Sequence, residues 1–274
     1  MSLDEAAESV LRDRWSRSQR HITMFSVVFP ALQLALCTVI VVVAGDGGIW
    51  PAAIPLVPVV ISAVALRQWL RRQAPLDPRM WLPAGFLVVG VQLLSVAIPA
   101  YDIATSSAPD GLTGPAVLFL LCWLVAVATC LSAHRAGRVL LTPLVAELGS
   151  ADLRLTVAVR AAATGPELVS AQIVVERDRV EWTVSLHVGR SGGPRTDVSV
   201  SFRELLQVMP VTLPVVPELR PWIVLSGGIT LYAQAGPAIL LTSTHDQWLI
   251  PVHDADLVAD LIRRRQALWL QENL

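Results

Sequence analysis

Residues 22–133 contain four long apolar runs that are separated by short polar loops. A helix of about 20 apolar residues is long enough to cross the hydrocarbon core of a bilayer, which is roughly 30 Å thick. None of the runs contains Asp, Glu, Arg or His. The pattern therefore predicts a four-helix transmembrane domain with spans at 22–44, 49–66, 82–100 and 115–133.

The first run has one competing interpretation, because Arg12, Arg14, Arg17 and Arg20 precede it in the manner of a signal peptide. The apolar core of a signal peptide is about 7–15 residues long and is followed by an Ala-x-Ala-like cleavage site. The run at 22–44 is longer, and no such site follows it. We therefore expect an uncleaved span.

The arginines indicate the orientation of these spans. They occur in the tail at 1–21, in the loop at 67–80 and directly after the fourth run, at Arg135 and Arg138, whereas the loops at 45–48 and 101–114 contain none. Loops rich in Arg stay on the cytoplasmic side. The sequence thus predicts a multi-pass protein of a bacterial cytoplasmic membrane, with both termini in the cytoplasm.

Two sets of polar residues in this half are candidate contact sites. Gln33 and Gln92 lie inside spans, where an amide side chain either bonds to another helix or lines a path for a substrate. The arginines of the second loop either contact the phosphates of anionic lipids or only determine topology. These candidates for lipid headgroup contacts are Arg67, Arg71, Arg72 and Arg79.

The pattern changes after the fourth run. We expect a linker at 134–152 and then a cytoplasmic α+β domain at 153–274, in which short alternating segments predict strands. Residues 189–195 are rich in Gly and predict a loop, and residues 202–209 predict a short helix that Pro210 ends. A final amphipathic helix is expected at 254–270, with Asp254 as its N-cap. The predicted strands are 153–160, 171–176, 180–188, 198–202, 222–225, 228–233, 238–242 and 248–252.

A run of short strands closed by one C-terminal helix is the plan of a pleckstrin-homology-like (PH-like) barrel. Residues 228–243, followed by 248–262, resemble the end of bacterial PH-like domains, in which an acid-Ala-x-x-Leu sequence leads into the capping helix. The layout also resembles actinobacterial multi-spanning membrane proteins with such a domain at the C-terminus. Some of these proteins carry an outer-loop motif that includes a His. This chain has Asp110 and Gly111 at a similar place but no His near them, so we transfer no residue role from the family. The resemblance implies a fold and a topology, and a fold alone does not fix an activity.

The candidate chemistry of the second half is sparse. His245 and His253, with neighbouring acids, either form a metal site or belong to a turn and a helix cap, and we favour the turn and cap. The Arg run at 263–265 either binds headgroups or an acidic partner, or forms a solvated helix face. No nucleotide-binding loop or hydrolase motif occurs. We therefore expect no catalytic residue, no metal and no cofactor.

The net charge of −1 gives no basic surface for nucleic acid. We expect a membrane-anchored, non-enzymatic interaction or regulatory module at the cytoplasmic face, such as an accessory, scaffold or immunity-type protein. Its expected partners are the lipid bilayer and either a protein or further copies of this chain. The alternatives are a transporter subunit or lipid-handling protein that uses Gln33 and Gln92, and a membrane enzyme with a site at the inner interface.

Overall fold

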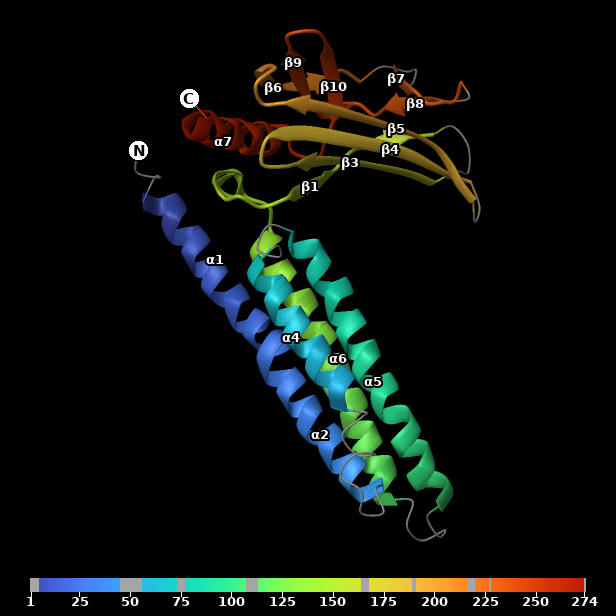
Figure 1. Cartoon of the computed structure of the whole chain (residues 1–274). Helices are drawn as coiled ribbons and strands as arrows, with labels where there is room; N and C mark the ends of the chain where they lie inside the picture. The colour runs from blue at the N-terminus through green and yellow to red at the C-terminus, as the bar shows by residue number, and fades with distance from the viewer. Residues whose placement is uncertain are drawn as a thin grey trace. The chain divides into compact units, whose positions relative to one another are not determined.

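The chain forms two compact units, Met1–Thr142 and Pro143–Leu274. The first unit is helical, and the second consists of antiparallel strands and a C-terminal helix (Figure 1). The boundary lies inside the predicted linker at 134–152, because the last helix of unit 1 continues to Leu141. The structure is a computed structural model that describes residues 5–44, 56–72, 77–106, 113–163, 168–188, 191–215, 220–226 and 228–273.

The chain begins with a continuous helical stretch made of α1 (Glu5–Thr23), the π-helix η1 (Met24–Val28) and α2 (Phe29–Ala44). The arginine-rich tail is therefore helical from Glu5. Pro30 explains the π segment, because proline has no N–H and its ring clashes with the carbonyl four residues earlier, here that of Ser26. The wider turn avoids this clash, and the Phe29 amide donates to the Met24 carbonyl, five residues back.

The other long helices of unit 1 are α4 (Leu56–Arg72), α5 (Trp81–Ser106) and α6 (Thr113–Leu141), and a short 3-10 turn, η2 (Pro78–Met80), precedes α5. Both α5 and α6 extend past the predicted ends of their spans. The start of the predicted second span at 49–55, with Pro51 and Pro55, lies outside the described residues, whereas Pro58 lies in the first turn of α4.

Two helical stretches in the described residues are long and apolar enough to cross a membrane, Ser9–Ile40 and Ala116–Leu141. A shorter apolar helix covers Leu56–Leu70. The α2 helix packs against α4, α5 and α6, and α1 packs against α6. Cys37 and Cys122 are buried free thiols inside this bundle.

Unit 2 contains two antiparallel meanders in chain order. The first sheet has the order β1-β3-β4-β5 and the second has the order β10-β9-β6, while a third small sheet, β2-β8-β7, is formed by the connections between their strands. The strands are β1 (Leu155–Ala158), β2 (Ala161–Ala162), β3 (Leu168–Val175), β4 (Arg179–Val188), β5 (Ser191–Ser201), β6 (Leu205–Leu213), β7 (Arg220–Val224), β8 (Thr230–Ala233), β9 (Gly236–Ser243) and β10 (Gln247–Pro251).

The two meanders share an apolar core. Trp182 of β4 and Trp248 of β10 stack edge to face with ring centroids 5.1 Å apart, which joins the two sheets. The C-terminal helix α7 (Ala255–Asn273) packs against β6, β9 and the 3-10 turn η4 (Ala146–Ser150). The predicted cap of α7 is confirmed, since Asp254 Oδ1 accepts a hydrogen bond from the Leu257 amide at 3.0 Å.

Two predictions for this unit are wrong. Residues 202–209, expected to be helical, lie largely in β6, which pairs with β9 in the register Val208 to Leu241. Pro210 does not end the element but pairs with Ile239, which is tolerated because β6 is an edge strand of its sheet. Residues 191–195, expected in a loop, begin the long strand β5.

Candidate functional site

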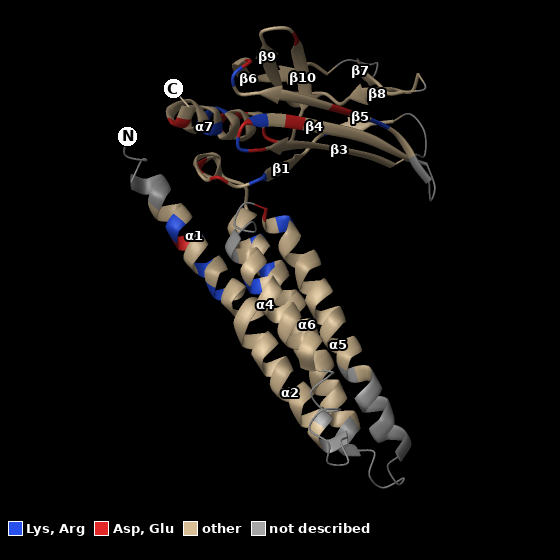
Figure 2. Cartoon of the chain, in the orientation of Figure 1, with Lys and Arg blue, Asp and Glu red and all other residues tan. Residues whose placement is uncertain are grey.

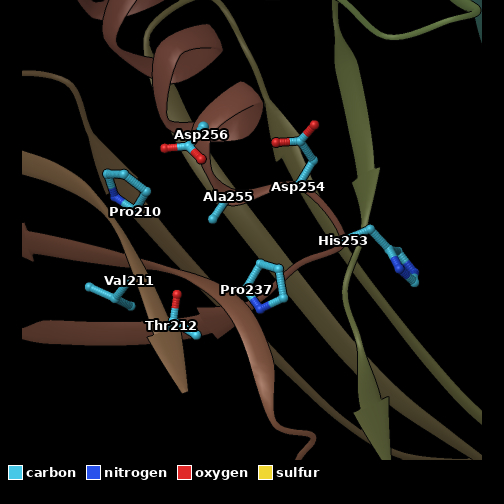
Figure 3. Close-up of a pocket in the computed structure, with 8 residues that line it drawn as sticks. All are labelled: Pro210, Val211, Thr212, Pro237, His253, Asp254, Ala255 and Asp256. Atoms are coloured by element: carbon cyan, nitrogen blue, oxygen red, sulfur yellow. The ribbon is translucent and has the colours of Figure 1, made fainter. Parts of the chain in front are cut away.

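A hollow of about 330 Å³ lies in unit 2 where α7 begins. Its walls come from β6, from Pro237 of β9 and from the segment 253–256 (Figure 3). Asp254 caps the helix, and Asp256 lies in the first turn, where a negative charge complements the helix dipole. Figure 3 shows that the side chains of His253, Asp254 and Asp256 point in different directions. The two carboxylates are thus explained by the stability of the helix end.

The structure separates the two histidines of the metal-site hypothesis. His245 lies in the turn between β9 and β10, where Ser243 Oγ accepts hydrogen bonds from the amides of His245 and Asp246, each at 3.1 Å. His253 follows the other end of β10, and a strand of five residues spans roughly 17 Å. No group of three or more His, Cys, Asp or Glu residues suited to a metal ion occurs among the described residues.

Arg265 is the most deeply buried charged residue in the described part of unit 2, with 1% of its surface exposed. Its guanidinium donates to five backbone carbonyls, which join α7 to η4, to the segment that follows η4 and to the turn after β3. Burial lowers the pKa of Arg265 to about 10, because desolvation penalises the charged form, and the charge of Asp152 opposes this effect. The side chain therefore stays protonated at neutral pH. The acceptors are Gly149 (2.8 Å), Leu153 (2.9 Å), Leu148 (3.3 Å), Glu176 (3.3 Å) and Ala151.

The arginine run at 263–265 is not simply a solvated helix face. Arg263 donates from Nε and Nη2 to the Val208 carbonyl, at 3.0 and 2.9 Å, and pairs with Asp260. Gln266 donates to the Leu205 carbonyl at 2.6 Å. With Arg265, these side chains fasten α7 onto the strands through main-chain acceptors. Their role in this structure is to position the helix.

Sequence reasoning missed a second carbonyl-binding arginine, Arg160. Its Nε donates to the Val252 carbonyl at 2.7 Å, and its two terminal nitrogens donate to the carbonyls of Ala235 and Pro237, at 3.0 and 2.7 Å. The adjacent Gly236 has a φ of +118°, a conformation that favours glycine, and a Cβ there would crowd the guanidinium. Arg160 thus ties the segment that follows β1 to the ends of β9 and β10.

In unit 1, Gln33 and Gln92 are both buried in the bundle, each with 2% of its surface exposed. Neither amide atom of Gln33 has a hydrogen-bond partner among the described residues, and the same holds for Nε2 of Gln92. The inter-helix contact of Gln33 therefore stays a prediction, and the neighbouring polar group on another helix is the Cys122 thiol of α6. Thr129, also buried, bonds to the Val125 carbonyl of its own helix at 2.8 Å.

We expect replacement of Gln33 by Leu to raise the stability of the bundle by about 1 kcal/mol, because a buried amide without a partner is costly and leucine is not. The measurement is thermal denaturation of the full chain in detergent. Gln68→Leu, at an exposed position of α4, is the matched control and should change stability by less than about 0.5 kcal/mol. A loss of stability in Gln33→Leu would show that the amide has a favourable partner.

The arginines of unit 1 gather toward one end of its helices (Figure 2). Arg67 and Arg79 are exposed there, and the side chains of Arg71 and Arg72 lie outside the described part of the structure. A second hollow, of about 250 Å³, lies at this end between η2, the start of α5 and the last turns of α6. It brings Arg79, a predicted lipid contact, together with His134 and Arg138 of α6.

The described polar groups thus fall into two kinds. Those of unit 2 mainly cap α7 or bind main-chain carbonyls, whereas those of unit 1 include buried amides and a basic hollow. Comparison of the chain with family models, curated proteins and solved structures finds no match. The function must therefore be argued from the geometry of the two units.

Proposed function

We propose that this chain is a membrane-anchored, non-enzymatic interaction module with four spans and a cytoplasmic PH-like domain. One observation carries the proposal. The chain contains both an apolar helical unit, whose arginines lie toward one end, and a separately packed β unit. The bundle serves as the anchor. Unit 2 presents the surface that binds a protein partner or another copy of the chain.

The outer surface of the helices supports membrane insertion. Leu87 and Leu94 of α5 are 72% and 74% exposed, and Ile61 of α4 is 61% exposed. Apolar side chains that face outward on long helices suit hydrocarbon and are costly in water. At 26 residues, α5 is about 39 Å long, which is sufficient to act as a span alongside the two candidate helices and α4. Arginine at a single end favours the orientation with that end in the cytoplasm.

The order of elements in unit 2 supports the PH-like proposal. A four-stranded antiparallel meander is followed by a three-stranded one and then by a helix that closes the core. This is the succession that the resemblance at 228–262 implies. The small sheet β2-β8-β7 is then an elaboration, built from the β1–β3 and β6–β9 connections.

Several apolar side chains of unit 2 project into solvent instead of the core, which supports a docking role. Leu168 of β3 is 75% exposed and Val224 of β7 is 62% exposed. Among the described strands, β7 pairs only with β8, so its outer edge carries main-chain groups without a strand partner. Exposed apolar residues and an open edge are features of a surface that another chain covers.

We expect a photo-crosslinking amino acid at Val224 or Leu168 of the full chain, expressed in native membranes, to give a discrete adduct. Adducts at multiples of 29.6 kDa would identify self-assembly, and another mass would identify a different partner. The control is Ser199, an exposed polar position of β5. The proposal fails if Val224 and Leu168 give no adduct, or if Ser199 gives the same pattern.

The transporter alternative keeps one specific observation in its favour, the unpaired amide of Gln33 in the bundle core. A path for a polar substrate would use such a group, and Gln33→Leu would then abolish flux without loss of the folded protein. The enzyme alternative requires a site at the inner interface. The hollow there is lined by two arginines and a histidine without a carboxylate or thiol, which suits the binding of an anion better than acid–base chemistry.

A further inference from the structure

We propose that the basic hollow of unit 1 binds the phosphate group of an anionic phospholipid of the inner leaflet. It is formed by η2 and the start of α5 on one side and by the last turns of α6 on the other. The assignment to the inner leaflet rests on the proposed orientation. The binding chemistry itself depends only on the groups that line the hollow.

The polar wall supplies cationic donors from two separate elements. Arg79 follows α4 in the chain and lies in η2, whereas His134 and Arg138 lie one turn apart on α6. A guanidinium presents a planar fork of N–H donors that matches two phosphate oxygens, and an imidazole adds a further donor. Because arginines from two elements line one hollow, they define a single position for a phosphate group. The arginines of α1 lie along one helix and define no such position.

One acidic residue lies beside this wall. Asp77 precedes η2, and its Oδ1 accepts a hydrogen bond from the backbone amide of Arg79 at 3.2 Å. This carboxylate caps the turn that carries Arg79 and thereby holds that residue at the rim. The residues that line the hollow include no Asp or Glu, so their net charge favours an anion.

The lining of the hollow also includes the apolar residues Leu82, Ala133 and Leu141. A free phosphate or a soluble phosphorylated metabolite would gain nothing from this surface, whereas the glycerol and first methylenes of a lipid would bury it. The hollow is shaped by close helix packing, since a Cβ on Gly137 would lie 3.3 Å from the Pro78 carbonyl oxygen. The combination of cationic and apolar walls selects a phosphate that is attached to acyl chains.

The test uses the purified full chain in nanodiscs made either of phosphatidylcholine or of phosphatidylcholine with phosphatidylglycerol. The readout is the amount of each phospholipid that stays bound after extraction into detergent, measured by native mass spectrometry. We expect the unmodified chain to retain phosphatidylglycerol selectively. Arg79→Gln/Arg138→Gln should lower this retention roughly tenfold, since each arginine near a membrane surface contributes several-fold to the affinity for anionic lipid.

Arg135→Gln is the matched control, because Arg135 is an exposed arginine on the same helix and does not line the hollow. It should retain phosphatidylglycerol as the unmodified chain does. The single change Arg138→Gln should also lower retention, and it leaves Arg79 and its turn intact. Retention should survive millimolar inorganic phosphate, since the apolar wall holds the lipid.

Three results would overturn the proposal. The first is equal retention by the double variant and the unmodified chain, and the second is an equal loss in Arg135→Gln, which would indicate only general surface charge. Displacement by inorganic phosphate would assign the hollow to soluble anions. Lipid retention does not depend on topology or on a protein partner. If the chain retains phosphatidylglycerol selectively but gives no crosslinks, the lipid site is supported and only the proposed interaction function is contradicted.

Discussion

Replacing Arg265 by Met is expected to destabilise unit 2 by about 2–4 kcal/mol, the largest effect of any single side chain considered. The guanidinium donates hydrogen bonds to five main-chain carbonyls, and methionine has no donor that could replace it. Part of this loss of stability is offset, because methionine removes the cost of burying a charged group. Domains of this size are stable by only about 5–15 kcal/mol, so unfolding should be easy to detect.

The measurement is hydrogen exchange of the full chain in detergent, followed on peptides from β3 and β4. Hydrogen exchange in these peptides should accelerate in Arg265→Met. The exchange rate of Arg265→Lys should lie between those of the unmodified chain and Arg265→Met, because an ammonium group has only three donors. The control is Arg177→Met, since Arg177 is exposed and forms surface pairs with Glu272 and Asp152. Because exposed ion pairs contribute little, this variant should exchange at nearly the rate of the unmodified chain. Unchanged exchange in Arg265→Met would show that water replaces the guanidinium without penalty.

Gly149→Val is expected to destabilise the same unit by about 3 kcal/mol, for a different reason. Gly149 lies in η4 against α7, where a Cβ would overlap the Leu261 carbonyl oxygen and lie 3.1 Å from the Cβ of Arg264. Because the Leu261 carbonyl belongs to the helix backbone, it cannot move aside without displacing α7. The substitution therefore forces η4 and the helix apart.

Chemical denaturation of the full chain, with exchange of α7 peptides as the local probe, measures this effect. Ser150→Ala, at the next residue of η4, is the matched control and should change stability by less than about 0.5 kcal/mol. Since Gly149 and Arg265 meet at one contact, the double variant should lose less than the sum of the two single effects. Full additivity would contradict the view that both residues act on one junction.

The strongest periodic signals in the sequence predicted the elements that the structure contains. The uncharged runs predicted the long helices, and the cap at Asp254 predicted the start of α7. The ends of helices were predicted less well, because α5 and α6 continue beyond the apolar residues to Ser106 and Leu141. Local hydrogen bonding carries a helix past the edge of its apolar run, and hydropathy does not record this.

The errors in unit 2 have a common cause, which is pairing between distant residues. Residues 202–209 have an apolar spacing compatible with a helix, but β9 offers them a ladder of main-chain hydrogen bonds. Residues 191–195 resemble a loop because of their glycines, yet Gly193 lies so close to the Leu186 carbonyl that no Cβ would fit. Gly193 thus allows close packing of the two strands, and only the partner strand reveals this role.

The candidate sites follow the same rule. Arg265 falls on the apolar stripe of α7, four residues after Leu261 and three after Ile262, and this spacing was the available signal for its burial. The carbonyls that it binds come from η4, from the segment that follows η4 and from the turn after β3, which no local pattern connects to the helix. In unit 1, Arg79 and Arg138 lie far apart in the sequence, so their convergence at one hollow depends on how α5 packs against α6.

The most direct test of the central claim is labelling with a membrane-impermeant maleimide in bacterial spheroplasts. Ser107→Cys places a thiol in the predicted outer loop, and Ser226→Cys places one at an exposed position of unit 2. The unmodified chain is the blank, because Cys37 and Cys122 are buried and Cys130 is partly buried. We expect Ser107→Cys to be labelled on intact spheroplasts and Ser226→Cys to be labelled only after lysis. Labelling of Ser226→Cys on intact spheroplasts would contradict a membrane anchor that holds unit 2 in the cytoplasm.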